Sequence, residues 1–292
     1  MANQANRLKE IFRRRNAAGC CDPIGARFEK ISNELSQEEL FGSVFCTQDE
    51  IAQSLHIRVP SQLRLLGRYT AEGVDYALGR YGIIQFLRRL GYTHPKITLD
   101  NNEVGDRIRI CGLANNEEYL LIECVLEHKN LFGSNMLYVH WLTLRNPRTR
   151  FVSKRPQLPG QEVPGLGLAR ESVELLIRIA KRLYLDGIAF RPSWYHTAYA
   201  ARYHLRFVNP IHQGQFEAMM RDLSSFPLWE ASVAISDGRV FLNNEPYSWE
   251  ADPMAYWFSD SQYEQDAIKD EYNRVHFALF PQSVTGNRQS SQ

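Results

Sequence analysis

The chain has 292 residues, of which 44% are hydrophobic, and its 34 basic residues nearly balance 33 acidic ones. This length and hydrophobic content predict one large domain or two small ones with a real core. The formal net charge of +1 at pH 7 excludes a strong overall attraction to nucleic acid or to an anionic membrane, so any anion site must be local.

Cysteine usage and hydropathy bear on the compartment. The cysteines are odd in number and lack the paired spacing of a zinc site or a disulfide framework. The charged start of the chain lacks the apolar run of a secretory signal, and no segment approaches the roughly 18 apolar residues of a membrane span. We therefore expect a cytoplasmic protein with no metal site and no membrane partner. The cysteines are Cys20, Cys21, Cys46, Cys111 and Cys124.

Residues 1–94 read as a helical N-terminal region. Leu8, Ile11 and Phe12 share one helical face, and residues 76–90 carry apolar side chains at helical spacing. The second of these segments predicts a helix that stops at Gly91.

From about residue 96 the pattern changes to strands. Four short segments are rich in β-branched and aromatic residues, and polar turns separate them. This pattern predicts an antiparallel meander of three or four strands. The segments are KITLD, DRIRICGLA, YLLIECVLEH and MLYVHWLTL.

A long connection with four prolines follows, and long loops of this kind are usually functional or disordered. It leads into residues 169–183, where an apolar stripe, early acids and late bases predict an amphipathic helix packed on a sheet. The segments GIAFRP, SWYHTAYAARYHL and RFVNP then predict a strand, a short helix and a strand. Together with the meander, these elements predict an α/β (α+β) fold with a mixed, mainly antiparallel sheet flanked by helices.

Residues 211–280 predict a C-terminal extension. It would contain a helix at GQFEAMMRDL, a hairpin in which the turn DG joins EASVAIS to RVFLN, and an aromatic segment. Residues 281–292 predict a disordered tail. The expected segments are therefore 1–94, 95–210, 211–280 and 281–292.

The head of the helix after the long connection reads PGLGLA, at residues 164–169. Backbone amides gathered at a helix start suit a phosphate. With the order of elements, this turn resembles the GNAT superfamily of acyl-coenzyme A dependent N-acyltransferases over roughly residues 96–210. In that family the turn has the pattern Gln or Arg, two residues, Gly, one residue, Gly or Ala, and its backbone amides bind the coenzyme A pyrophosphate. Here Glu162, Gly165 and Gly167 stand at the three defined positions. The residues that the resemblance implies for coenzyme A binding are Val163, Gly165, Leu166, Gly167, Leu168, Ala169 and Arg170.

The resemblance implies a transferase that moves an acyl group from acyl-CoA, acetyl-CoA or a longer chain, to an amine acceptor. An acyl carrier protein is the alternative donor, since the basic residues between 145 and 155 suit an acidic carrier as well as a nucleotide. The family holds the thioester in a splay between two parallel strands, here MLYVHWLTL and GIAFRP.

Acyl transfer needs a base for the amine and a proton donor for the leaving thiolate. Glu123 and His140 are the candidate bases, because each is ionisable in an otherwise apolar strand. His140 as a core histidine bonded to a backbone carbonyl, and Glu123 as a solvent-facing residue, stay open as structural alternatives. Tyr199, Tyr203 and Tyr195 are the candidate donors to the thiolate, with packing as the alternative.

Two other functions remain possible from the sequence. Glu162, and Arg202 where the family usually has a tyrosine, depart from the family pattern and favour a non-catalytic GNAT-fold scaffold that acts on a protein partner. RNA binding through the basic loop has only Phe151 as aromatic support, so we expect no nucleic acid partner. Splayed strands at 138–144 and 188–191 would favour the enzyme.

Overall fold

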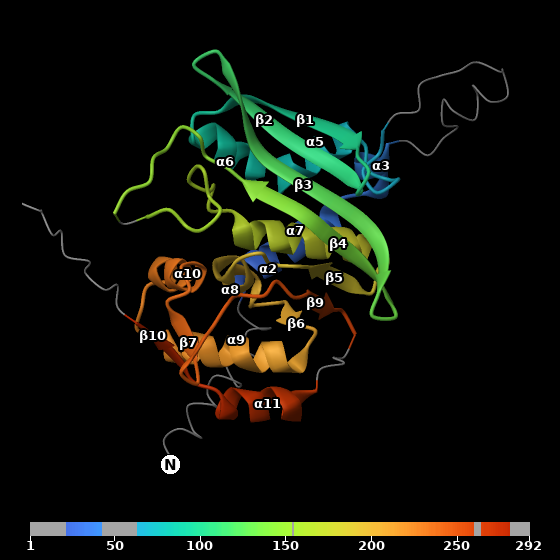
Figure 1. Ribbon diagram of the computed structural model, residues 1–292. Helices are drawn as coiled ribbons and strands as arrows, with labels where there is room; N and C mark the ends of the chain where they lie inside the picture. Colours follow the sequence, from blue (N-terminus) through green and yellow to red (C-terminus); the bar gives the residue numbers. More distant parts are fainter. Residues whose placement is uncertain (1–21, 43–62, 154, 260–263, 281–292) are drawn as a thin grey trace, which may run out of the picture. The chain divides into compact units, whose positions relative to one another are not determined.

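The computed structural model describes residues 22–42, 63–153, 155–259 and 264–280 (Figure 1). The helix face expected at Leu8, Ile11 and Phe12 and the tail expected after residue 280 lie outside these residues.

The largest element is a seven-stranded, mostly antiparallel sheet with the order β1-β2-β3-β4-β5-β9-β6. The first four strands form the expected antiparallel meander, and β5 joins β4 in parallel. With its flanking helices (Figure 1), this sheet confirms the mixed α/β class. The strands are β1 Thr93–Asn101, β2 Asp106–Ala114, β3 Glu117–Leu131, β4 Ser134–Leu144, β5 Gly187–Phe190, β6 Arg206–Phe207 and β9 Met254–Trp257.

The chain divides into two compact units, each built from separated segments. The first comprises residues 1–150, 163–190 and 256–259, and the second comprises residues 151–162, 191–255 and 260–292. Within the described residues, no helix combines the length and hydrophobicity that a bilayer crossing requires.

The helices of the first unit begin at recognisable caps. The Asp22 carboxylate accepts from the Ile24 N–H at the start of α2, and Ser36 with Glu39 forms a capping box at α3. The Thr70 hydroxyl accepts from the Gly73 N–H at the start of α5. The helices are α2 Pro23–Glu34, α3 Gln37–Phe41, α5 Ala71–Arg80, α6 Ile83–Arg89 and α7 Ala169–Arg182.

The helix expected over 76–90 is wrong in its continuity, because the chain divides there into α5 and α6. Gly82 between them has φ +83°, in the left-handed region. One such residue ends a right-handed helix, and glycine adopts this conformation at little cost.

The second unit is built on a cluster of aromatic side chains. The rings of Tyr195 and Phe207 each contact Phe216, and Trp249 contacts all three. Its elements besides β6 are α8 Tyr195–Ala201, α9 Pro210–Asp222, α10 Leu228–Ser236, α11 Gln265–Arg274 and a small sheet of β10 Phe277–Leu279, β7 Val240–Leu242 and β8 Glu245–Pro246.

The hairpin expected at 230–243 is wrong, because EASVAIS belongs to helix α10. Ala231, Ala234 and Ile235 are buried on one helical face, and the small side chains let that face pack closely. RVFLN does supply a strand, β7, but this strand pairs with β8 and β10.

Candidate functional site

The parallel ladder between β4 and β5 is short. Its ladder runs from Met136 opposite Gly187 to Val139 opposite Phe190, where β5 ends, while β4 continues to Leu144. Gly187 is required at the start of β5, because a Cβ there would overlap the carbonyl oxygen of Tyr256. Among the described residues, the parallel ladder with β5 includes no residue of β4 beyond Val139.

The glycine-rich turn is fixed to the end of β4. The Asn146 N–H, two residues after that strand, donates to the Pro164 carbonyl at 2.7 Å. The buried Asn146 side chain accepts from the Tyr92 hydroxyl at 2.8 Å. Gly167 adopts φ +80°, and α7 begins without a side-chain cap. The turn thus presents an uncapped helix N-terminus, with its orphan N–H groups, beside the carboxyl end of β4.

The turn faces outward through its backbone. Leu166 and Leu168 are buried anchors, whereas Gly167 and Ala169 between and after them are exposed, and Val163 and Gly165 are partly exposed. Only main-chain groups of these residues can therefore meet an anion.

Arg170 has another charge beside it. Its Nη2 lies 2.8 Å from Asp22 Oδ1. Burial raises the pKa of Asp22, but hydrogen bonds from the Gly25 and Ile24 N–H groups and from Arg170 outweigh it, so the pKa is lowered overall. The expected phosphate ligand Arg170 thus joins the cap of α2 to the start of α7.

His140 is the first residue of β4 beyond the parallel ladder. It is also a bulge residue, because Val139 lies opposite Leu126 and Trp141 opposite Val125, which leaves His140 with no counterpart on β3. The site therefore places an ionisable side chain just beyond the last residue pair of the parallel ladder.

The imidazole of His140 is paired with a carboxylate. Its Nε2 lies 2.8 Å from Glu127 Oε2, and its ring packs edge-on against Tyr138. The hydrogen bond with His140 is the main cause that lowers the pKa of Glu127, and Lys129 adds to it. The alternative of a core histidine bonded to a backbone carbonyl does not describe this residue.

Glu123 is part of a cross-strand ion network. Ile122, Cys124 and Leu126 line an apolar cavity on one face of β3, so Glu123 points to the opposite face, as does Glu127. Its Oε1 lies 3.8 Å from Arg107 Nη1, and Arg107 binds Asp100 at 2.7 Å. This pairing supports a structural role for Glu123 beside its candidacy as a base.

Tyr199 and Tyr203 lie in the second unit, where they hold Arg202 between them. The guanidinium carbon lies 3.6 Å and 4.2 Å from the two ring centroids, and Nη2 donates to the Tyr203 hydroxyl at 2.7 Å. The structure thus brings together Glu127 with His140 in the first unit and both tyrosines with Arg202 in the second.

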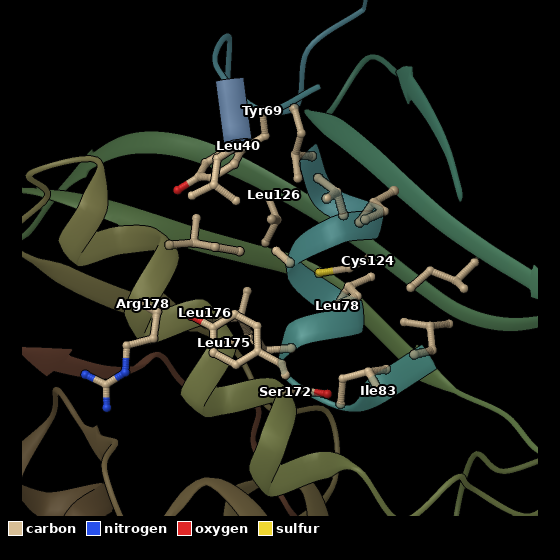
Figure 2. A pocket seen from close by; sticks show the side chains of 18 of the residues that line it. Leu40, Tyr69, Leu78, Ile83, Cys124, Leu126, Ser172, Leu175, Leu176 and Arg178 are labelled. Atoms are coloured by element: carbon tan, nitrogen blue, oxygen red, sulfur yellow. The ribbon is translucent and has the colours of Figure 1, made fainter. Parts of the chain in front are cut away.

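The sequence reading missed two features of the first unit. Glu127 lies four residues after Glu123, on the same face of β3, but its hydrogen bond with His140 depends on the bulge in β4. The other feature is a cavity of about 130 Å³ between the sheet and helices α5 and α7 (Figure 2). Apolar residues of β2, β3, α5 and α7 look like ordinary core positions, so sequence alone gives no sign that a space lies among them.

No protein-family model matches the chain, and comparisons with curated proteins and with solved structures find no significant match.

Proposed function

We propose that this chain is a GNAT-type acyltransferase that moves an acyl group from acyl-CoA to an amine. The observation that carries the proposal is the β4, α7, β5 unit of the first compact unit. Two parallel strands pair over four residues, the first strand continues beyond the end of the second, and a helix without a side-chain cap begins after a glycine-rich turn beside the end of the first strand. Ligands of α/β sheets bind at the carboxyl ends of parallel strands, where helix N-termini favour negative charge.

In this proposal the turn binds the coenzyme A pyrophosphate through backbone N–H groups at Gly167 and Ala169. The thioester extends to the part of β4 beyond Val139, where the parallel ladder with β5 has ended. Alignment of thioester and amine supplies much of the rate enhancement, because it converts an encounter into a reaction within one complex.

The proposed chemistry is direct transfer. The amine nitrogen attacks the thioester carbonyl carbon, so a C–N bond forms and the C–S bond breaks. The imidazole of His140 accepts the proton that the amine loses, and the Glu127 carboxylate stabilises the resulting imidazolium. The departing thiolate takes its proton from solvent.

The second candidate function is a non-catalytic scaffold of the same fold. It is favoured by the ion pair between Arg170 and Asp22, which draws a cation away from the turn, and by the exposed Glu162 beside the turn. Both features weaken attraction for a diphosphate.

Isothermal titration of the full chain with acetyl-CoA tests the proposal. We expect micromolar binding that Gly165→Asp abolishes, because a carboxylate in the turn repels the diphosphate. Gly79→Asp is the matched control, since a Cβ on Gly79 in α5 meets no atom within 4 Å. Equal binding by both variants, or no binding by wild-type protein with a cooperative thermal transition, would refute the donor site and favour the scaffold or a carrier-protein donor.

A further inference from the structure

The cavity in the first unit is enclosed almost wholly by hydrocarbon. Strands β2, β3 and β4 form one wall, and helices α5 and α7 form the other. Figure 2 shows Leu40 and Tyr69 at one end and Ile83 and Ser172 at the other, with Leu126, Cys124 and Leu78 between them. We infer that this cavity is a binding site for a short hydrocarbon chain.

The size of the cavity sets the size of the ligand. Its volume is about 130 Å³. Well-packed interiors have few spaces larger than a water molecule, and an apolar cavity of roughly 150 Å³ in another protein binds benzene. The space therefore suits about six non-hydrogen atoms.

The walls make water a poor occupant. A buried water needs two to four polar partners, but the guanidinium groups at the rim are engaged elsewhere. Arg178 pairs with Glu29 and Glu174, and Figure 2 shows its guanidinium turned away from the cavity. Arg182 donates to the carbonyls of Ser32 and Leu35. A hydrocarbon can occupy such a space without displacing a polar contact.

Tyr69 lies at one end of the cavity, next to Leu40. The residue is only 5% exposed, and among the described residues its buried hydroxyl has no hydrogen-bond partner. Burial raises the pKa of Tyr69, so the phenol is neutral and can both donate and accept. Two backbone hydrogen bonds with Leu65 and an edge-on contact with the Phe41 ring fix its position. The hydroxyl is not accessible from the cavity, so a ligand would contact other atoms of Tyr69.

The chain could come from a free compound or from the acyl group of a thioester. The second source rests on the proposed function. It is geometrically reasonable because the cavity is also lined by Leu142, beyond the parallel ladder of β4, and by Leu168, at the start of α7. Both sources would present the same hydrocarbon chain to the cavity, and the experiment distinguishes them.

The test is titration of the full chain with 1-hexanol and with benzene, followed by calorimetry. We expect one molecule of either probe per chain. Ala77→Leu should weaken both at least tenfold because Ala77 lines the cavity, whereas Ala71→Leu, the same change in the same helix outside the lining, should not. Tyr69→Phe should leave both affinities unchanged, because the hydroxyl is not accessible from the cavity.

A second measurement needs no variant. Cys124 lines the cavity and is buried, so 1-hexanol should slow its alkylation in the wild-type protein, measured on the peptide that contains it. Hexanoyl-CoA that binds at least tenfold more tightly than acetyl-CoA would assign the chain to the donor. Binding of 1-hexanol with no such preference would assign the site to a free ligand and leave the donor site to the Gly165→Asp test. The inference is overturned if the wild-type protein does not bind 1-hexanol and binds hexanoyl-CoA no more tightly than acetyl-CoA. It is also overturned if Ala77→Leu, still folded, binds 1-hexanol as the wild type does.

Discussion

A single histidine of α8 makes the second unit sensitive to acid. Burial lowers the pKa of His196 from 6.5 to about 4, and its Nδ1 is buried without a hydrogen-bond partner among the described residues. The folded protein therefore holds this imidazole neutral at a pH where the unfolded chain already binds a proton. Since the unfolded state then binds more protons, stability falls as the pH falls from about 6.5 to about 4.

We predict that His196→Gln removes this part of the pH dependence. The free energy of unfolding of the wild type should decrease by up to about 1.4 kcal/mol per pH unit more than that of the variant within this window. Urea unfolding at pH 7, 6 and 5 measures the difference. His128→Gln, at an exposed histidine, is the control, and a His196→Gln profile parallel to the wild type would show that the imidazole is solvated.

Individual residues also show how much of the candidate site could be predicted from the sequence. Residue type alone identified His140, because an ionisable group in an apolar strand is unusual. It could not identify Glu127 as its partner, since a one-residue bulge decides which side chains of β3 and β4 lie together. Nor could it show that Arg170 binds Asp22, which lies 148 positions earlier in the chain.

At the scale of elements, some helices and strands were predicted correctly from the sequence and others were not. The meander, α7 and β5 were predictable because each has a clear hydrophobic period. The division of 76–90 at Gly82 was not predicted, because a single left-handed glycine interrupts an apolar spacing that otherwise continues as one helix. Helix α10 was not predicted, because its three buried small or aliphatic residues also fit a strand followed by a turn.

Helix α5 offers a sharp test of packing, because two of its glycines have opposite surroundings. A Cβ on Gly73 would overlap the backbone carbonyl of Leu40, at the contact with α3, whereas a Cβ on Gly79 would meet nothing. We predict that Gly73→Ala destabilises the protein by about 2 kcal/mol or more through this overlap. Gly79→Ala should be neutral or stabilise it by about 0.5–1 kcal/mol, because alanine favours the helix.

Chemical unfolding of the two variants, followed by circular dichroism, checks this prediction. Equal stabilities would mean that α3 does not lie against α5 as described.

At the scale of the whole molecule, neither compact unit is continuous in sequence. The first unit needs residues 163–190 to complete what residues 1–150 begin. Those later residues contain α7 and β5, which bury Leu126, Met136 and Leu137 of the sheet together with Leu176 and Ala180 of the helix. A chain that ends at residue 150 would leave this apolar surface in water.

We therefore predict that the fragment 1–150 unfolds without a cooperative transition, whereas the full chain unfolds cooperatively. The fragment 1–190, which adds α7 and β5, should recover much of the transition. Urea unfolding monitored by tryptophan fluorescence and circular dichroism distinguishes the three chains. A steep transition in 1–150, at the midpoint of the full chain, would mean that the meander folds independently of α7.

Three parts of the sequence meet at Asn146. Its N–H holds the Pro164 carbonyl, its side chain holds the Tyr92 hydroxyl, and the nearby Arg148 donates to the carbonyl of Gly91 at the end of α6. The conformation of the glycine-rich turn thus depends in part on the corner between α6 and β1. In a collection of variants selected for altered ligand affinity, changes would gather at this corner as well as at the turn, and distance along the chain would be a poor guide to which residues matter.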